Sequence, residues 1–160
     1  MDSIANTAQS HVRAASERVI HLMSFVPDDR LSWAPSPTSR SFLQVVAHIA
    51  STNRAFAQIL SDEMPEEVPS PDDFFRVLRV AEERITTRED AIADFTESTE
   101  ELRKAMSSLT AENIATDRRS PFGPMPAQAW LDIVQGHIEG HRGQLEFLQT
   151  LWGDLDQHRS

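Results

Sequence analysis

The chain has 160 residues, which is enough to bury a substantial core, and we expect a single domain over residues 1–160. Its formal net charge of -10 argues against a nucleic-acid or anionic-membrane surface, because both need a basic patch. It contains no cysteine, which excludes a disulfide framework and a thiol nucleophile carried by the protein itself.

Residues 3–25 are predicted to form the first long helix. The apolar positions follow a helical period: Ile4, Ala8, Val12, Ala15, Val19 and Leu22. The segment lacks the basic-then-apolar layout of a signal peptide, and no apolar run approaches the roughly 20 residues of a membrane span. We therefore expect a cytoplasmic protein without a membrane anchor.

A second long helix is predicted to start at a capping box formed by Ser41 and Gln44 and to continue to about Ser61. The segment before it, residues 31–40, is expected to be a loop because its prolines forbid helix. Residues 62–69 are acidic and proline-bearing, so they are also expected to form a loop.

The connection that follows contains a further helix start at Ser70 and Pro71, which predicts a short helix within a long link. Thr87 to Asp90 is the next capping signal and begins the third long helix. Its apolar stripe consists of Ile92, Phe95, Leu102, Met106 and Leu109.

Residues 120–126 break the chain, and Pro126 suits the first turn of a fourth long helix that ends at Gly153. No convincing strand is present. Four long amphipathic helices without a strand partner predict an all-α four-helix bundle. The long link would also allow the second and third long helices to run parallel.

Three histidines form the principal candidate site. His137 and His141 are spaced i, i+4, which places both rings on one side of a helix, and they interrupt an apolar stripe that points inward. His48 shares its helix face with apolar residues and should also point inward. Three neutral imidazoles could bind Zn²⁺, Ni²⁺ or a similar cation with a coordination position left open. The alternative is three ordinary histidines, each bonded to a backbone carbonyl or a water molecule.

A zinc-protease helix is not indicated, because that motif needs a Glu directly after the first His. The nearby carboxylate is Glu139, two positions after His137, on the opposite helix face. Gly136 and Gly140 precede the two histidines and weaken the helix slightly; a close helix contact or access to a metal would explain them.

The remaining histidines carry less weight. His11 lies at the edge of the first helix's apolar stripe, and His21 and His158 are expected to be exposed to solvent.

Four other side chains have both a functional and an ordinary interpretation. Gln144 lies one turn beyond His141 and would either hydrogen-bond to a ligand or simply pack. Trp33 is expected to anchor its loop, with the rim of a pocket as the alternative. Arg40 and Arg142 could attract an anionic substrate but are expected to face water.

The chain resembles the DinB/YfiT-like family of small metal-binding four-helix bundles over essentially its whole length. The resemblance rests on LSWAPSPTSRSFLQVVAHIAS and on HIEGHRGQLEFLQTLWG, similar to the family's tryptophan-proline loop and its H-x3-H-x2-Q-L ending. It implies an up-down-down-up bundle with Zn²⁺ or Ni²⁺ held by His48, His137 and His141. It also implies a homodimer.

Family members with an assigned activity resemble metal-dependent transferases or isomerases that use a small cellular thiol such as bacillithiol or mycothiol. The resemblance therefore favours a metal-dependent transferase that activates a small external thiol. Two alternatives remain open: a metal-dependent hydrolase that activates water, and a non-enzymatic metal-binding or interaction bundle.

Overall fold

Two of the long helices begin at side-chain caps that the sequence predicts. In this computed structural model, which describes residues 4–158, the Ser41 hydroxyl accepts from the Gln44 amide while the Gln44 side chain accepts from the Ser41 amide, so the predicted capping box is confirmed. Thr87 caps the third long helix through its hydroxyl, which accepts from the amide of Asp90. The predicted first residue of the first helix, Ser3, lies outside the described residues.

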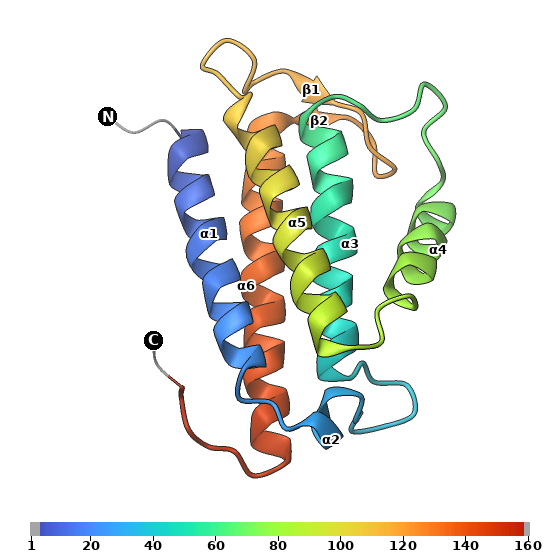
Figure 1. The fold of residues 1–160 in the computed structure, drawn as a ribbon. Coiled ribbons are helices and arrows are strands. Elements are labelled where there is room, and N and C mark those ends of the chain that lie inside the picture. Colours follow the sequence, from blue (N-terminus) through green and yellow to red (C-terminus); the bar gives the residue numbers. More distant parts are fainter. Residues whose placement is uncertain (1–3, 159–160) are drawn as a thin grey trace.

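Four long helices form the bundle (Figure 1). They are α1 (Ile4–Met23), α3 (Phe42–Leu60), α5 (Arg88–Ser107) and α6 (Ala127–Leu151). The chain leaves α6 through Gly153, whose φ of 90° is a left-handed conformation that favours glycine, so the predicted stop is confirmed.

The bundle has the expected up-down-down-up order. Figure 1 shows α3 and α5 running in one direction and α1 and α6 in the other. Helix α3 packs against α5 and α6, and α1 packs against the same two helices from the other side. The long link between α3 and α5 is what permits this parallel pair. Within the described residues, no helix has the length and apolar character that a membrane crossing requires.

The predicted apolar stripes form the core, with one exception. Leu22, Phe95, Leu102 and Leu145 are fully buried. Ile4 was expected inside but is 51% exposed, because the buried face of α1 begins at Ala5, which is 3% exposed, and Ile4 lies to the side of that face.

Short elements occupy the links. Helix α4 (Pro71–Glu82) is the predicted helix between the second and third long helices, capped by the Ser70 hydroxyl. Helix α2 (Asp28–Leu31) was not predicted, because a single helical turn is too short to show a period.

A two-stranded ribbon corrects the expectation of no strand. Strands β1 (Asp117–Arg118) and β2 (Met125–Pro126) pair antiparallel before α6. Two residues cannot display the alternating pattern from which a strand is inferred. Pro126 consequently precedes α6 as its N-cap and does not lie within its first turn.

A layer of polar side chains divides the core into two apolar clusters. One cluster contains Ile49 and Ile138, and the other contains Phe56 and Val134. Between them lie buried polar residues: Ser51, Thr52, Asn53, Ser98 and Thr99. His48 and His137 are at this level, so the candidate site lies where the two apolar clusters meet.

The C-terminal segment corrects the expectation that His21 and His158 are exposed. Arg18 donates to the carbonyl oxygens of residues 157 and 158 and draws this segment against α1. The His158 ring stacks on Phe25 with centroids 4.0 Å apart, and its side chain is only 12% exposed. His21 packs edge-on against the same phenylalanine. The local sequence contains no pattern that would predict this return of the C-terminal segment to the bundle.

Glycines within α6 stand beside open space. A Cβ built at Gly136, Gly140 or Gly143 would meet no atom within 4 Å. The close helix contact considered for Gly136 and Gly140 is therefore wrong.

Gly143→Ala is expected to stabilise the protein by about 0.5–1 kcal/mol, because alanine loses less backbone entropy in a helix. The midpoint of thermal unfolding, followed by circular dichroism, should rise by roughly 1–4 °C. Gly153→Ala is the matched control and should lower it, because a Cβ is strained at positive φ. A lower midpoint for Gly143→Ala would contradict this account.

Candidate metal centre

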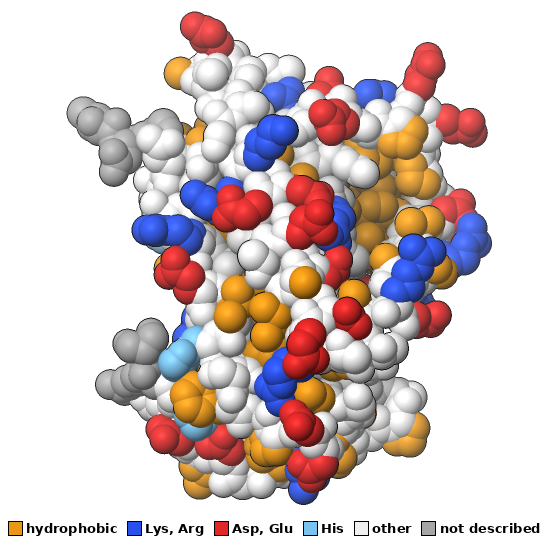
Figure 2. Space-filling model, viewed as in Figure 1, with side chains coloured by type: hydrophobic (Ala, Val, Ile, Leu, Met, Phe, Trp, Pro, Cys, Tyr) orange, Lys and Arg blue, Asp and Glu red, His pale blue; other side chains and the backbone are white. Residues whose placement is uncertain are grey.

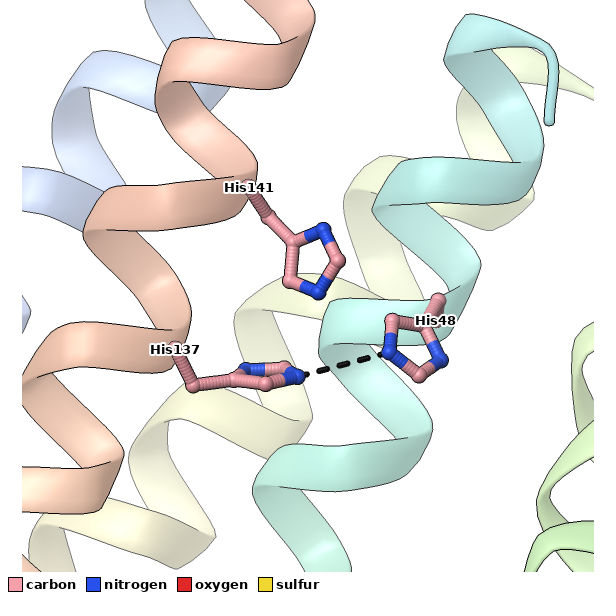
Figure 3. Close-up of side chains that lie close together, drawn as sticks. All are labelled: His48, His137 and His141. Atoms are coloured by element: carbon pink, nitrogen blue, oxygen red, sulfur yellow. Dashed lines mark hydrogen bonds between the residues drawn. The ribbon is translucent and has the colours of Figure 1, made fainter. Parts of the chain in front are cut away.

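Three imidazole rings from two helices meet at the polar layer. His48 extends from α3, and His137 and His141 extend from successive turns of α6 (Figure 3). Their ring centroids are 4.5–5.3 Å apart, and one nitrogen from each ring lies within 4.8 Å of the others. The structure thus brings together the three histidines that the sequence singled out.

The far nitrogens of two rings are held by side-chain oxygens. His48 Nδ1 lies 2.7 Å from a carboxylate oxygen of Glu82, and His141 Nδ1 lies 2.9 Å from the side-chain oxygen of Gln144. Because these oxygens accept, each Nδ1 donates and each Nε2 keeps its lone pair in the neutral ring. Both rings are therefore prepared to bind a cation through Nε2.

His137 is largely buried, and more deeply so than His141. Burial, together with the charges of His141, His48 and Arg40, lowers the pKa of His137 from 6.5 to about 3. Burial also lowers the pKa of His141, although its bond to Gln144 opposes that change. Both rings are consequently neutral near pH 7, the protonation state that a metal ligand needs.

Glu82 was missed by sequence reasoning. It ends α4 and is 8% exposed, with one oxygen on His48 and the other 3.4 Å from Arg40. Burial alone would raise the pKa of Glu82, but the bond to His48 and the charges of His48 and Arg40 outweigh it, so the pKa lies below its ordinary value. Glu82 is therefore a carboxylate that orients and polarises His48.

Two of the three ligand nitrogens are already spaced as on a divalent cation, and the third lies within 4.8 Å of them. Two ligands about 2.0–2.1 Å from a tetrahedral Zn²⁺ would lie roughly 3.3–3.4 Å apart, and the Nε2 atoms of His48 and His137 are 3.4 Å apart. Nδ1 of His137 is buried without a hydrogen-bond partner among the described residues, so protein groups alone leave this ring incompletely satisfied. Without a cation, His137 Nε2 can donate to the lone pair of His48 Nε2; a cation between the two nitrogens would take the place of that hydrogen bond.

A hollow opens beside the histidines. It has a volume of about 310 Å³ and is bounded by α3, α6, α4 and the segment before α6. Figure 2 shows apolar side chains gathered in the recess between α4 and the bundle. The hollow is contiguous with all three rings, so a small molecule within it would reach them.

Other residues singled out by the sequence lie elsewhere. His11 is exposed and bonded to Gln135. Glu139 is exposed and paired with Arg142 at 2.7 Å, which leaves no carboxylate in the position of a protease base. Trp33 packs edge-on against Trp152, as the anchor interpretation expected.

Arg40 and Arg142 have different surroundings. Arg40 lies beside His48 and Glu82, close to the site. Arg142 is occupied by two carboxylates, those of Glu139 and Glu146. Neither side chain is simply solvated, and Arg142 is not available to an anion.

The family follows from the sequence match that spans this site. Residues 11–145 match the family model of the DinB superfamily. The chain belongs to the DinB superfamily. The matched region contains all three histidines and Glu82.

Solved structures share the fold at low sequence identity. A DinB-like protein (YjoA) from Bacillus subtilis matches with a TM-score of 0.70 at 20% identity, over 94% of this chain and 95% of that one. A DinB-like protein from Bacillus cereus matches with a TM-score of 0.65 at 18% identity, over 87% and 86% of the two chains. No curated protein sequence matches the chain.

A third structure is the mycothiol-dependent maleylpyruvate isomerase. It matches with a TM-score of 0.71 at 13% identity, over 91% of this chain and 63% of that one. This DinB chain therefore spans less than two thirds of the isomerase. At such identities the likeness shows a shared fold.

Proposed function

We propose that this DinB protein is a metal-dependent enzyme that transfers a group to a small external thiol. The observation that carries the proposal is the convergence of three imidazole rings beside an open hollow. We assign His48, His137 and His141 as the metal ligands, with Zn²⁺ or Ni²⁺ as the metal.

The chain's own residues orient the site and exclude water from it. A cation held by three neutral ligands keeps its full charge and lowers the pKa of a coordinated thiol or water molecule. The side-chain oxygens of Glu82 and Gln144 accept hydrogen bonds from Nδ1 of His48 and Nδ1 of His141, and these bonds fix the orientation of the two rings. The buried wall of α3 and α6 behind the rings keeps solvent from that side.

The thiol must come from solution, because the chain has no cysteine. In the proposed reaction its sulfur bonds to an electrophilic carbon of the second substrate, the bond from that carbon to a leaving group breaks with its electron pair, and the thiol proton passes to solvent. The mycothiol dependence in the isomerase's name supports the choice of a thiol. The match covers 63% of the isomerase chain, so the isomerase reaction itself is not carried over.

Turnover with and without thiol tests this function. The protein, purified without a histidine tag and loaded with Zn²⁺ or Ni²⁺, is given 1-chloro-2,4-dinitrobenzene with mycothiol or bacillithiol, and thioether formation is followed. We expect the rate to rise with thiol concentration, to fall to background after EDTA treatment, and to return when metal is restored.

A parallel assay uses p-nitrophenyl esters without thiol. Metal-dependent ester hydrolysis without any thioether formation would contradict the transferase and favour the hydrolase. Stoichiometric metal without turnover in either assay would favour a non-enzymatic metal-binding bundle.

A further inference from the structure

We infer that the hollow beside the three histidines binds an uncharged, apolar group of the substrate, about the size of one or two aromatic rings. The inference rests on the proposed function, because it takes the histidines as the reacting end of the site. It adds the chemical class of the molecule that the site accepts.

The inner wall of the hollow is buried and apolar. Phe56 and Ile59 extend from α3, and Trp130 extends from α6. Phe56 and Trp130 are 7% and 2% exposed and lie 6.1 Å apart between ring centroids. Phe56 also meets the His137 ring edge-on at 5.4 Å, so the apolar wall continues directly into the candidate metal centre.

The outer wall is a cluster of three phenylalanines. Phe74 and Phe75 come from α4, and Phe122 comes from the turn between β1 and β2. All three ring pairs have centroids 5.7–5.8 Å apart. Phe75 and Phe122 are nevertheless 42% and 50% exposed. An apolar ligand between this cluster and Trp130 would cover aromatic surface that the protein leaves in water, which is favourable.

The hollow offers nothing to a charged group away from the histidines. Among the described residues, no Asp, Glu, Lys or Arg lines it. Besides the histidines, the wall carries the Thr52 hydroxyl, which already donates to the His48 carbonyl at 2.7 Å, and the indole nitrogen of Trp130, which is buried behind the surface of the wall. A carboxylate there would lose its hydration without gaining a partner, which is costly.

The size of the hollow limits the group it can take. A volume of about 310 Å³ lies at the low end of small-molecule sites, which typically measure about 300–1,000 Å³. The electrophilic end would point to the histidines and the apolar end to Phe75 and Phe122. We therefore assign aryl or branched-alkyl electrophiles as the substrate class.

A neutral fluorescent probe tests the hollow without the metal. The neutral two-ring fluorophore 6-propionyl-2-(dimethylamino)naphthalene is titrated into EDTA-treated protein, and we expect saturable binding at one site per chain. Phe122→Ser should weaken that binding at least about tenfold, which corresponds to roughly 1.4 kcal/mol. Phe75→Ser, on a different element, should act in the same direction.

The matched control is Phe147→Ser. Phe147 is 62% exposed on α6 and does not line the hollow, so this variant should bind the probe like the wild type. Two competitors that differ in charge test the exclusion of charged groups. Naphthalene-2-methanol should displace the probe at least about tenfold better than naphthalene-2-carboxylate.

The outcomes separate the two proposals. Probe binding that is absent, or that Phe147→Ser weakens as much as Phe122→Ser does, overturns the apolar site. Equal displacement by the alcohol and the carboxylate overturns the assigned substrate class. Metal binding is not needed for any of these results, so a metal-free wild-type protein would refute the proposed function while leaving the apolar site standing.

Discussion

His137→Ala is expected to remove stoichiometric metal. His137 is largely buried, and its Nε2 lies only 3.4 Å from Nε2 of His48. Losing this ligand should weaken the metal affinity by more than about 100-fold, beyond the 10–100-fold effect typical of outer-shell partners. Mass spectrometry of the dialysed, tag-free protein should find one Zn²⁺ or Ni²⁺ per wild-type chain and almost none in the variant.

Unfolding temperature provides a second readout. Metal at 100 times its Kd should raise the wild-type midpoint by roughly 5–10 °C, and should leave His137→Ala unchanged. His11→Ala, which removes an exposed histidine on α1, should retain the wild-type shift. A wild-type protein without metal, or a variant that binds as tightly as the wild type, would refute the ligand assignment.

Glu82→Gln is expected to weaken metal binding by about 10–100-fold. The amide has nearly the same size and can still accept from His48 Nδ1, but it lacks the negative charge that makes the ring a stronger donor to the metal. Competition with a coloured chelator at constant pH measures the affinity directly.

The neighbouring Glu83 offers a matched control for this change. It is exposed at the end of α4 and has no contact with the histidines, so Glu83→Gln should bind metal like the wild type. Equal affinities for Glu82→Gln and Glu83→Gln would show that the carboxylate does not act on His48.

Local signals account for most of what the sequence predicts. The hydroxyl of Ser41 and the side chain of Gln44 are three residues apart, so their pattern is visible before any fold is known. The same holds for His137 and His141, whose shared face follows from helical spacing alone. His48 could be joined to them only through the bundle and the family resemblance, because it lies on another helix.

The missed features depend on contacts between distant segments. Glu82 is 34 residues from His48, in a link whose position over the bundle no period reveals. His158 is buried through the return of the C-terminal segment to Arg18 and Phe25. The hollow itself needs Phe122 and Phe75 brought together from separate links. Such positions are determined by packing and not by propensity.

Helix α4 carries both Glu82 and Phe75, and these are seven residues apart, two turns along one face. Glu82, whose carboxylate orients His48, and Phe75, which belongs to the aromatic wall of the hollow, therefore move together with α4. Any force that shifts α4 acts on both. By thermodynamic reciprocity, whatever factor a bound apolar molecule applies to the metal affinity, the metal must apply to the affinity for that molecule. Because α4 lies in the link between the two parallel helices, this link would couple the binding of the metal to the binding of the apolar molecule.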